Sequence, residues 1–393
     1  MTSRDWLEAH LEWFAPELWN EFLPARPFGG GPLLELLILC DEVPGLAVTG
    51  PALELAGRLT AAPEFRAGLY RGDAYFTYHV WLLVLVDRLG GRRPELLAAA
   101  QGLLDAGVRP NQDGIGALEL RYVTDLGGLT NPYLPSARRL YDRWREGQHL
   151  DPFRMTDADC YALTHAVFYG TAFGRTTMRP DPALTRATRL MLATHLAHGD
   201  LDLGAELFHT ALLTGASSES VRQRLATAAR AGGAVAGPRH DPAVAARLTG
   251  RKADAYEFGT CYHTTLVTEL ALAAPVSGEP MNEPGLIEDL VFAFRRGDLS
   301  RTATLLSRAA HESRRDPAVA AAVGHLRAQR QPDGSFGSPP DAERAALCEA
   351  ALERFGVAGG AGPAEPSAVV DGRVTWVSGR RRAARSRPDA REW

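Results

Sequence analysis

A histidine recurs in the same apolar setting along this chain, and this recurrence most constrains the fold. The segments DAYFTYH from Asp73, DCYALTH from Asp159 and EFGTCYH from Glu257 each place an acid six positions before a histidine, and DLGAELFH from Asp202 does so with one extra residue. The four histidines, at positions 79, 165, 209 and 263, are 86, 44 and 54 residues apart, and the segment around Tyr122 fits as an intervening unit without one. A period of roughly 43 to 54 residues is typical of a repeat made of two helices.

The segments between these histidines are also helical in pattern. Apolar residues recur at i, i+3, i+4 and i+7, while runs that alternate in the manner of strands are nearly absent. Gly and Pro interrupt the pattern at short intervals, as in LGGRRPE and GLTNPYLP. The sequence therefore predicts an all-α fold, built as an array of helical hairpins.

One turn motif near the carboxyl end favours closure of the array into a ring. Gln331, Asp333, Gly334, Ser335 and Phe336 form a Q-x-x-D-G-S-F run. This run resembles the turn of the terpenoid cyclase and protein prenyltransferase superfamily, with Phe in place of the usual Trp. The resemblance implies a closed (α/α) toroid of about six helical hairpins around a central cavity, which we expect over residues 31–356.

The two ends of the chain differ from this array. Residues 1–30 predict an amphipathic helix that caps the first repeat, with a dimer contact as the alternative role. Residues 357–393 predict a flexible linker and a basic tail, for which solvation is a simpler explanation than binding of RNA or an acidic partner.

Composition limits the classes of partner. With 43 basic and 47 acidic residues, the net charge of −4 gives no field that would recruit nucleic acid or a membrane. No apolar run reaches the roughly 20 residues that span a bilayer, and no signal segment is evident. Four widely spaced cysteines fit no disulfide scaffold. We therefore expect a cytoplasmic protein that acts on a small molecule.

Inside a toroid, polar residues of the inner helices converge from distant parts of the sequence. On an ideal helix Tyr161, His165 and Tyr169 share one face, and Asp202, Glu206 and His209 share another. A single buried histidine is most often bonded to a backbone carbonyl. Four in matching phase indicate a functional centre, because Leu would fill a purely structural position at lower cost.

The predicted centre has two sets of residues. The expected metal ligands are His165, Glu206, His209 and His263, and the expected catalytic residues are Asp159, Tyr169, Asp202 and Tyr262. His79 stays open, because the VWLLVLV run that follows it fits a core helix.

Three functions fit such a centre. The first is a metal-dependent enzyme of small-molecule metabolism, since imidazoles with a carboxylate suit a divalent ion such as zinc or iron. The second is a metal-free acid–base cyclase or isomerase that resembles class II terpene cyclases, although DLDLG from Asp200 lacks the last acids of their motif and Asp-x-Asp is also common as a helix cap. The third is a non-catalytic ring that binds a partner.

Overall fold

The computed structural model describes residues 1–393 except 110–113, 217, 275–284, 310–314 and 356–393. The described residues form nineteen α-helices and no β-strand, so the all-α prediction is confirmed. The predicted linker and tail at 357–393 lie outside the described residues. The chain divides into two compact units, Met1–Arg296 and Gly297–Trp393, and the toroid domain expected over 31–356 spans this division.

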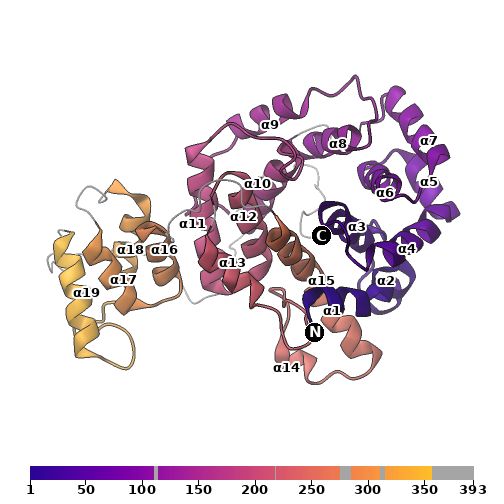
Figure 1. The fold of residues 1–393 in the computed structure, drawn as a ribbon. Coiled ribbons are helices and arrows are strands. Elements are labelled where there is room, and N and C mark those ends of the chain that lie inside the picture. The colour runs from indigo at the N-terminus through magenta and orange to yellow at the C-terminus, as the bar shows by residue number, and fades with distance from the viewer. Residues whose placement is uncertain (110–113, 217, 275–284, 310–314, 356–393) are drawn as a thin grey trace, which may run out of the picture. The chain divides into compact units, whose positions relative to one another are not determined.

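Six helices of the first unit form a circuit of contacts. Each packs against the next in chain order, and the last packs back on the first (Figure 1). These helices, called the ring helices below, are α3 (Gly31–Glu42), α6 (Phe76–Arg88), α8 (Ile115–Leu126), α10 (Asp157–Gly170), α12 (Leu201–Leu213) and α15 (Arg251–Ala273).

Most of the other helices of this unit pack on the ring helices from outside (Figure 1). The bounds of these other helices are α4 (Thr49–Ala61), α5 (Pro63–Arg71), α7 (Pro94–Asp105), α9 (Ala137–Glu146), α11 (Pro182–His198), α13 (Glu219–Ala226), α14 (Pro242–Ala245) and α16 (Leu286–Arg295). The last of them, α16, packs on the outer helix α11. Several begin with Pro in the first turn, where its missing N–H costs nothing, as in α5, α7 and α11.

The amino-terminal segment differs from its prediction. In place of one helix over residues 1–30, the structure has α1 (Ser3–Ala9), a 3-10 helix (Leu11–Phe14) and α2 (Pro16–Phe22). The break precedes Pro16 because Ala15 is extended, at φ −74° and ψ 130°, as a residue before proline prefers. The apolar side chains of this segment are buried on α15, where Trp6, Trp13 and Phe14 surround Phe258.

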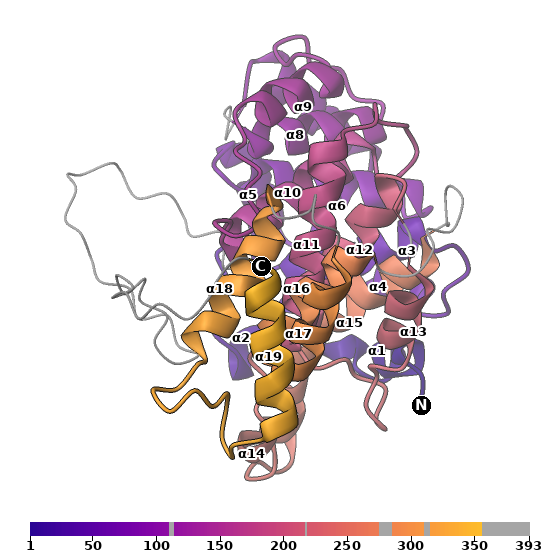
Figure 2. The same ribbon diagram turned by 90° about the vertical axis from the view of Figure 1, so that its left-hand side faces the viewer.

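The second unit contains α17 (Leu299–Arg308), α18 (Pro317–Ala328) and α19 (Ala342–Arg354), which pack against one another (Figure 2). The Q-x-x-D-G-S-F turn lies between α18 and α19, in this unit. Asp333 accepts a hydrogen bond from the Ser335 amide, Gly334 has φ +83°, and the Phe336 side chain is fully buried. Positive φ explains the glycine at this position.

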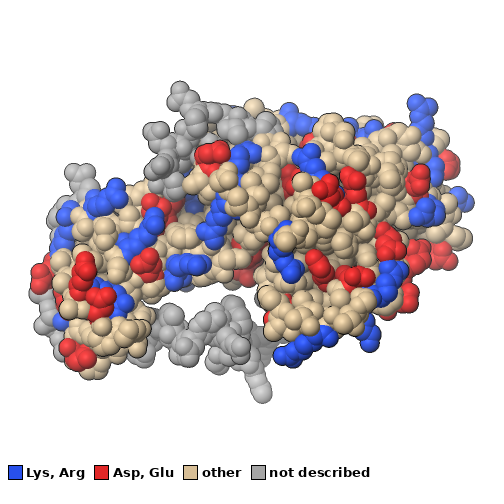
Figure 3. All heavy atoms as spheres, turned by 60° about the horizontal axis from the view of Figure 1, so that its bottom comes forward, with Lys and Arg blue, Asp and Glu red and all other residues tan. Residues whose placement is uncertain are grey.

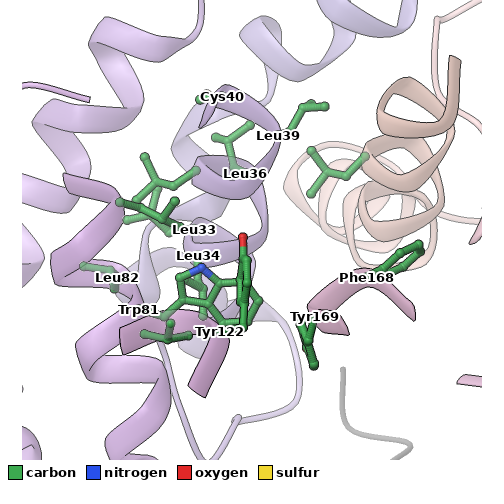
Figure 4. Packing of buried hydrophobic residues seen from close by; sticks show 14 of the residues in the cluster. Leu33, Leu34, Leu36, Leu39, Cys40, Trp81, Leu82, Tyr122, Phe168 and Tyr169 are labelled. Carbon is green, nitrogen blue, oxygen red and sulfur yellow. The ribbon is translucent and has the colours of Figure 1, made fainter. Parts of the chain in front are cut away.

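Apolar side chains fill the space between neighbouring ring helices. The run from Val80 to Val86 in α6 is almost completely buried, and Trp81 packs with Leu33 and Leu34 of α3 in the same core (Figure 4). Among the described helices, none combines the length and apolarity that crossing a membrane would require. Basic and acidic side chains are interspersed on the face shown in Figure 3, without a large region of one sign.

Candidate active site

Polar side chains from four ring helices meet inside the first unit. Glu35 of α3, His165 of α10, Asp202 and Glu206 of α12, and His263 of α15 contribute to one network, called the central cluster below. These residues are far apart in sequence, and they are brought together because the last ring helix packs on the first.

His263 lies between carboxylates on both sides of its ring. Its Nδ1 donates to Glu35 Oε2 at 2.9 Å, and its Nε2 is 3.3 Å from Glu206 Oε1 and 3.7 Å from Asp202 Oδ2. Burial alone would lower the pKa of His263, but the charges of Asp202 and Glu35 and the hydrogen bonds to Glu206 and Glu35 hold it well above its usual value. The surrounding carboxylates therefore favour the imidazolium form of this side chain.

The two acids of α12 respond in opposite directions to this environment. Burial would raise the pKa of Glu206, but the hydrogen bond to His263 and the charges of His165 and His263 leave it below its usual value. Burial dominates at Asp202 and raises its pKa, although hydrogen bonds from Thr264 and Tyr161 favour the ionised form. Glu206 is thus the acid that stays ionised most firmly.

Two histidines of the cluster are partly accessible to solvent. His165 Nε2 is 3.9 Å from Glu206 Oε2, and burial lowers the pKa of this ring. Yet 24% of the His165 side chain and 20% of the His263 side chain remain accessible. Both rings therefore keep some accessible surface, although surrounding protein desolvates His165.

A second acid lies beside the central cluster. Tyr169 of α10 donates to Glu119 Oε1 of α8 at 2.9 Å. Burial raises the pKa of Glu119 to about 7, against the lowering effect of this hydrogen bond. The Tyr169 ring stacks on Tyr122 at 5.5 Å and meets the edge of Trp81 at 5.7 Å (Figure 4), and its centroid is 5.8 Å from that of His165. Aromatic packing therefore positions this acid pair next to His165.

His209 is buried among aromatic rings. Its ring centroid is 4.9 Å from Phe168 and 6.2 Å from Phe173, and its Nδ1 has no hydrogen-bond partner among the described residues. Burial lowers the pKa of His209 to about 4, so the ring is neutral. His209 forms no ion pair with the central cluster in the described part of the chain. The charge of Glu206 acts to raise the pKa of His209, against the larger effect of burial.

The loop after α10 holds Phe173 against these rings. Ala172 and Phe173 both have positive φ, at 48° and 53°, a conformation that costs non-glycine residues energy. Arg175 anchors the loop to the end of α3, with Nη2 2.8 Å from Asp41 and Nη1 2.6 Å from Glu42. The ion pairs and the packing of Phe173 on Tyr122 offset the backbone cost.

The predicted site residues thus fall into groups. The structure brings His165, Asp202, Glu206 and His263 into the central cluster. Tyr262 joins it through a 3.4 Å hydrogen bond to Glu35 Oε1. Tyr169 belongs to the neighbouring pair with Glu119, and His209 lies among aromatic rings.

Two residues of the repeated acid-and-histidine pattern, Asp159 and His79, lie outside these groups. Asp159 is exposed and forms a capping box with Thr156 at the start of α10, so it acts at the helix end. His79 Nδ1 donates to the Tyr75 carbonyl oxygen, and the ring packs between Phe28 and Phe65. It faces α5 so closely that a Cβ on Gly68 would lie 2.3 Å from its Nε2. His79 therefore belongs to the interface with an outer helix.

The sequence interpretation missed Glu35 and Glu119. A signal was present, because each is an acid directly enclosed by leucines, in LLELL and ALEL, as Glu206 is enclosed in GAEL. An acid in an apolar helical run is costly unless it has partners, so these positions are candidates for a polar centre.

The described residues include no group of three or more His, Cys, Asp or Glu side chains arranged to hold a metal ion. In the central cluster the ligand-type atoms pair with one another, and His263 uses both ring nitrogens toward carboxylates. The arrangement thus combines His263, whose pKa is raised by its acidic neighbours, with Glu206, whose pKa is lowered, and Asp202, whose pKa is raised by burial.

Comparison with known proteins gives one match. The profile of a family described as Domain of unknown function (DUF6895) matches residues 2–273, which include the amino-terminal segment and all six ring helices. No curated protein and no solved structure matches the chain. Because the match covers more than half of the 393 residues, the chain belongs to the DUF6895 family.

Proposed function

We propose that the ring helices form a closed (α/α) toroid whose hollow is the functional site. The contact of α15 with α3 supports closure, and the outer helices on α3, α6, α8, α10 and α12 support a hairpin for each repeat. The accessible surfaces of His165 and His263 support a hollow. On this basis the toroid comprises the family region and ends before the second unit.

Within this hollow, acid–base catalysis on a small organic molecule is the activity that the geometry supports best. The observation that carries it is His263 between Glu35 and the pair Glu206 and Asp202. Neighbouring groups whose pKa values are pushed in opposite directions are a recurring feature of acid–base enzymes. A cyclase or isomerase reaction needs only such proton transfers.

Each group then has a role. Glu206, held ionised, is the general base, and the His263 imidazolium stabilises negative charge that develops on the substrate. Glu119, with a pKa of about 7, can donate a proton near neutral pH. His165, which faces both Glu206 and Tyr169, orients the substrate between these acids.

A substitution of the base tests this proposal. The purified protein is incubated with a cell-free metabolite extract, and mass spectrometry follows compounds that disappear and appear. We expect Glu206→Gln to slow the conversion by roughly 10²- to 10⁴-fold, because the amide cannot accept the proton. His79→Gln is the matched control, since it replaces a buried imidazole at the interface with α5.

Two results would contradict the proposal. Conversion by Glu206→Gln at the wild-type rate would remove Glu206 as the base. A complete lack of conversion by the wild type, with retention of a compound by the folded protein, would favour the non-catalytic binding ring.

A metal-dependent enzyme is the second candidate, supported by the contact of His263 Nδ1 with Glu35. Metal-binding histidines usually donate one ring N–H to a carboxylate, which leaves the other nitrogen for the ion. Here that nitrogen faces Glu206 and Asp202, which could bind zinc or iron if the ion replaced the Nε2 proton. His165 would complete the set, and His209 would have to rotate to contribute.

Elemental analysis separates the two candidates. If the second holds, protein expressed with supplemented zinc or iron carries one ion per chain, and His263→Gln loses it without unfolding. His209→Gln is expected to keep the ion, because His209 makes no ion pair with the cluster. Metal-depleted protein that converts substrate at the full rate would overturn this candidate.

The setting proposed for this activity is the cytoplasm. All four cysteines are buried free thiols, as expected where disulfides do not form. No nucleic-acid partner is proposed. The aromatic side chains of the amino-terminal segment pack on α15, so a homodimer formed through this segment would make its contacts with the exposed polar side of the segment.

A further inference from the structure

Arg26 lies in the segment between α2 and α3, at the edge of the central cluster. Its guanidinium carbon is 4.3 Å from the centre of the Trp19 ring and 5.4 Å from that of Tyr262. It also donates a hydrogen bond to the Tyr262 side chain. The group lies beside the start of α3, where a Cβ on Gly31 would be 3.7 Å from Nη1. Aromatic contacts thus hold this cation in a fixed orientation.

Arg26 stacks on aromatic rings without an acidic partner in the described part of the chain. Among the described residues no carboxylate lies within ion-pair distance of Arg26. Arg251, by contrast, stacks on Trp13 at 5.1 Å and is paired with Glu12. A stacked guanidinium without a carboxylate keeps N–H groups for an oxyanion, which it binds through two parallel hydrogen bonds.

A short chain of contacts links Arg26 to the proposed catalytic groups. The Tyr262 hydroxyl, bonded to Arg26, donates to Glu35 Oε1 at 3.4 Å, and Glu35 Oε2 accepts from His263 Nδ1. One tyrosine side chain therefore separates the guanidinium from the acid–base centre. A small molecule could reach both at once.

We propose that Arg26 binds a carboxylate group of the substrate and positions the rest of the molecule at His263 and Glu206. This inference rests on the proposed function. A carboxylate, with one negative charge, fits better than a phosphate dianion, because Glu35, Asp202 and Glu206 share a single imidazolium and repel added negative charge. Arg26 is thus a specificity-determining residue for a small carboxylic acid.

Calorimetric titration at pH 7 and low salt tests the inference on the full-length protein. The probes are acetate, propionate and lactate, with propionamide as the neutral isostere of propionate and inorganic phosphate as the dianion. We expect at least one carboxylate to bind at least tenfold more tightly than propionamide and phosphate. Arg26→Gln should lose this preference, and Arg26→Lys should keep part of it, because lysine retains the charge without the planar fork.

Arg251→Gln is the matched control, because it removes an arginine stacked on a tryptophan of the same segment that already has an acidic partner. It should bind the carboxylates as the wild type does, and circular dichroism checks that each variant is folded. Equal binding of propionate by wild type and Arg26→Gln overturns the inference, and so does a failure of every carboxylate to bind. Tighter binding of phosphate than of carboxylates overturns the assigned ligand class.

The result is separable from that of the proposed function. If the metabolite experiment finds a substrate whose KM and kcat are unchanged in Arg26→Gln, the proposed enzymatic activity is supported and the proposed role of Arg26 is contradicted. If carboxylates bind through Arg26 and no metabolite is converted, carboxylate binding at Arg26 is supported and the proposed catalysis is contradicted.

Discussion

Replacing His263 by glutamine should lower the free energy of unfolding by about 3–5 kcal/mol, as breaking a buried ion pair does elsewhere. The variant leaves Glu35, Asp202 and Glu206 close together without the imidazolium that they share. For a unit of this size the melting temperature would fall by roughly 5–8 °C. Urea denaturation at pH 6 measures the change directly.

The double variant His263→Gln/Glu206→Gln separates charge from packing. It removes one of the carboxylates left without the imidazolium, so it should be more stable than His263→Gln alone. The effects of the two substitutions on the free energy of unfolding are then strongly non-additive. His79→Gln is the control, because its Nδ1 is bonded to a backbone carbonyl and its combination with Glu206→Gln should be additive. A double variant no more stable than His263→Gln would show that the carboxylates do not depend on the imidazolium.

The pH window follows from the directions of the two shifts. Because the pKa of His263 is raised, its contribution is complete below the unfolded value near 6.5 and is lost as pH rises through the folded value. Because the pKa of Glu206 is lowered, its contribution is present above the unfolded value near 4.3 and is lost as pH falls through the folded value. The difference between wild type and variant should be largest at about pH 5–6.5.

Glu119→Gln should stabilise the protein at pH 8 by up to about 3 kcal/mol, since its pKa of about 7 lies well above that of the unfolded chain. In the wild type, stability falls as pH rises from about 4.5 to 7, because the unfolded chain releases the proton of Glu119 while the folded protein retains it. The glutamine carbonyl can still accept from Tyr169, and it has no charge to desolvate. Unfolding curves from pH 4 to 9 measure this difference.

Tyr169→Phe provides the opposite test of the same pair. The hydrogen bond from Tyr169 lowers the pKa of Glu119, so its loss should raise that pKa and extend the loss of stability to higher pH. Parallel pH profiles for wild type and Glu119→Gln would contradict the assignment of a buried, near-neutral acid.

The helices and half of the site were predictable, because they depend on local pattern. The helical periodicity predicted the helices, the repeated spacing predicted His165 and His263, and the shared face with Asp202 predicted Glu206. Asp159 occupies the same phase as Asp73 and Glu257, yet its position three residues after Thr156 makes it a capping residue. The spacing of acid and histidine could not distinguish a cap from a site residue.

The other half depends on tertiary contacts that no local pattern contains. Glu35 acts in the site only because α15 packs on α3, and its partner is 228 residues away. His79 belongs to the same repeat of acid and histidine and yet faces α5, where Gly68 leaves room for its ring. The division of the amino-terminal segment was foreseeable from Pro16, whose effect on Ala15 outweighs a continuous apolar face.

The pairing of Glu35 with His263 also bears on how the protein is made. A ribosome releases α3 long before α15, at roughly 5–20 residues per second, so Glu35 exists for about ten seconds or more before its partner is synthesised. During that interval water must solvate the carboxylate, because burial without a cation is costly. We therefore expect the packing of α3 at Glu35 to be completed only after α15 has been synthesised.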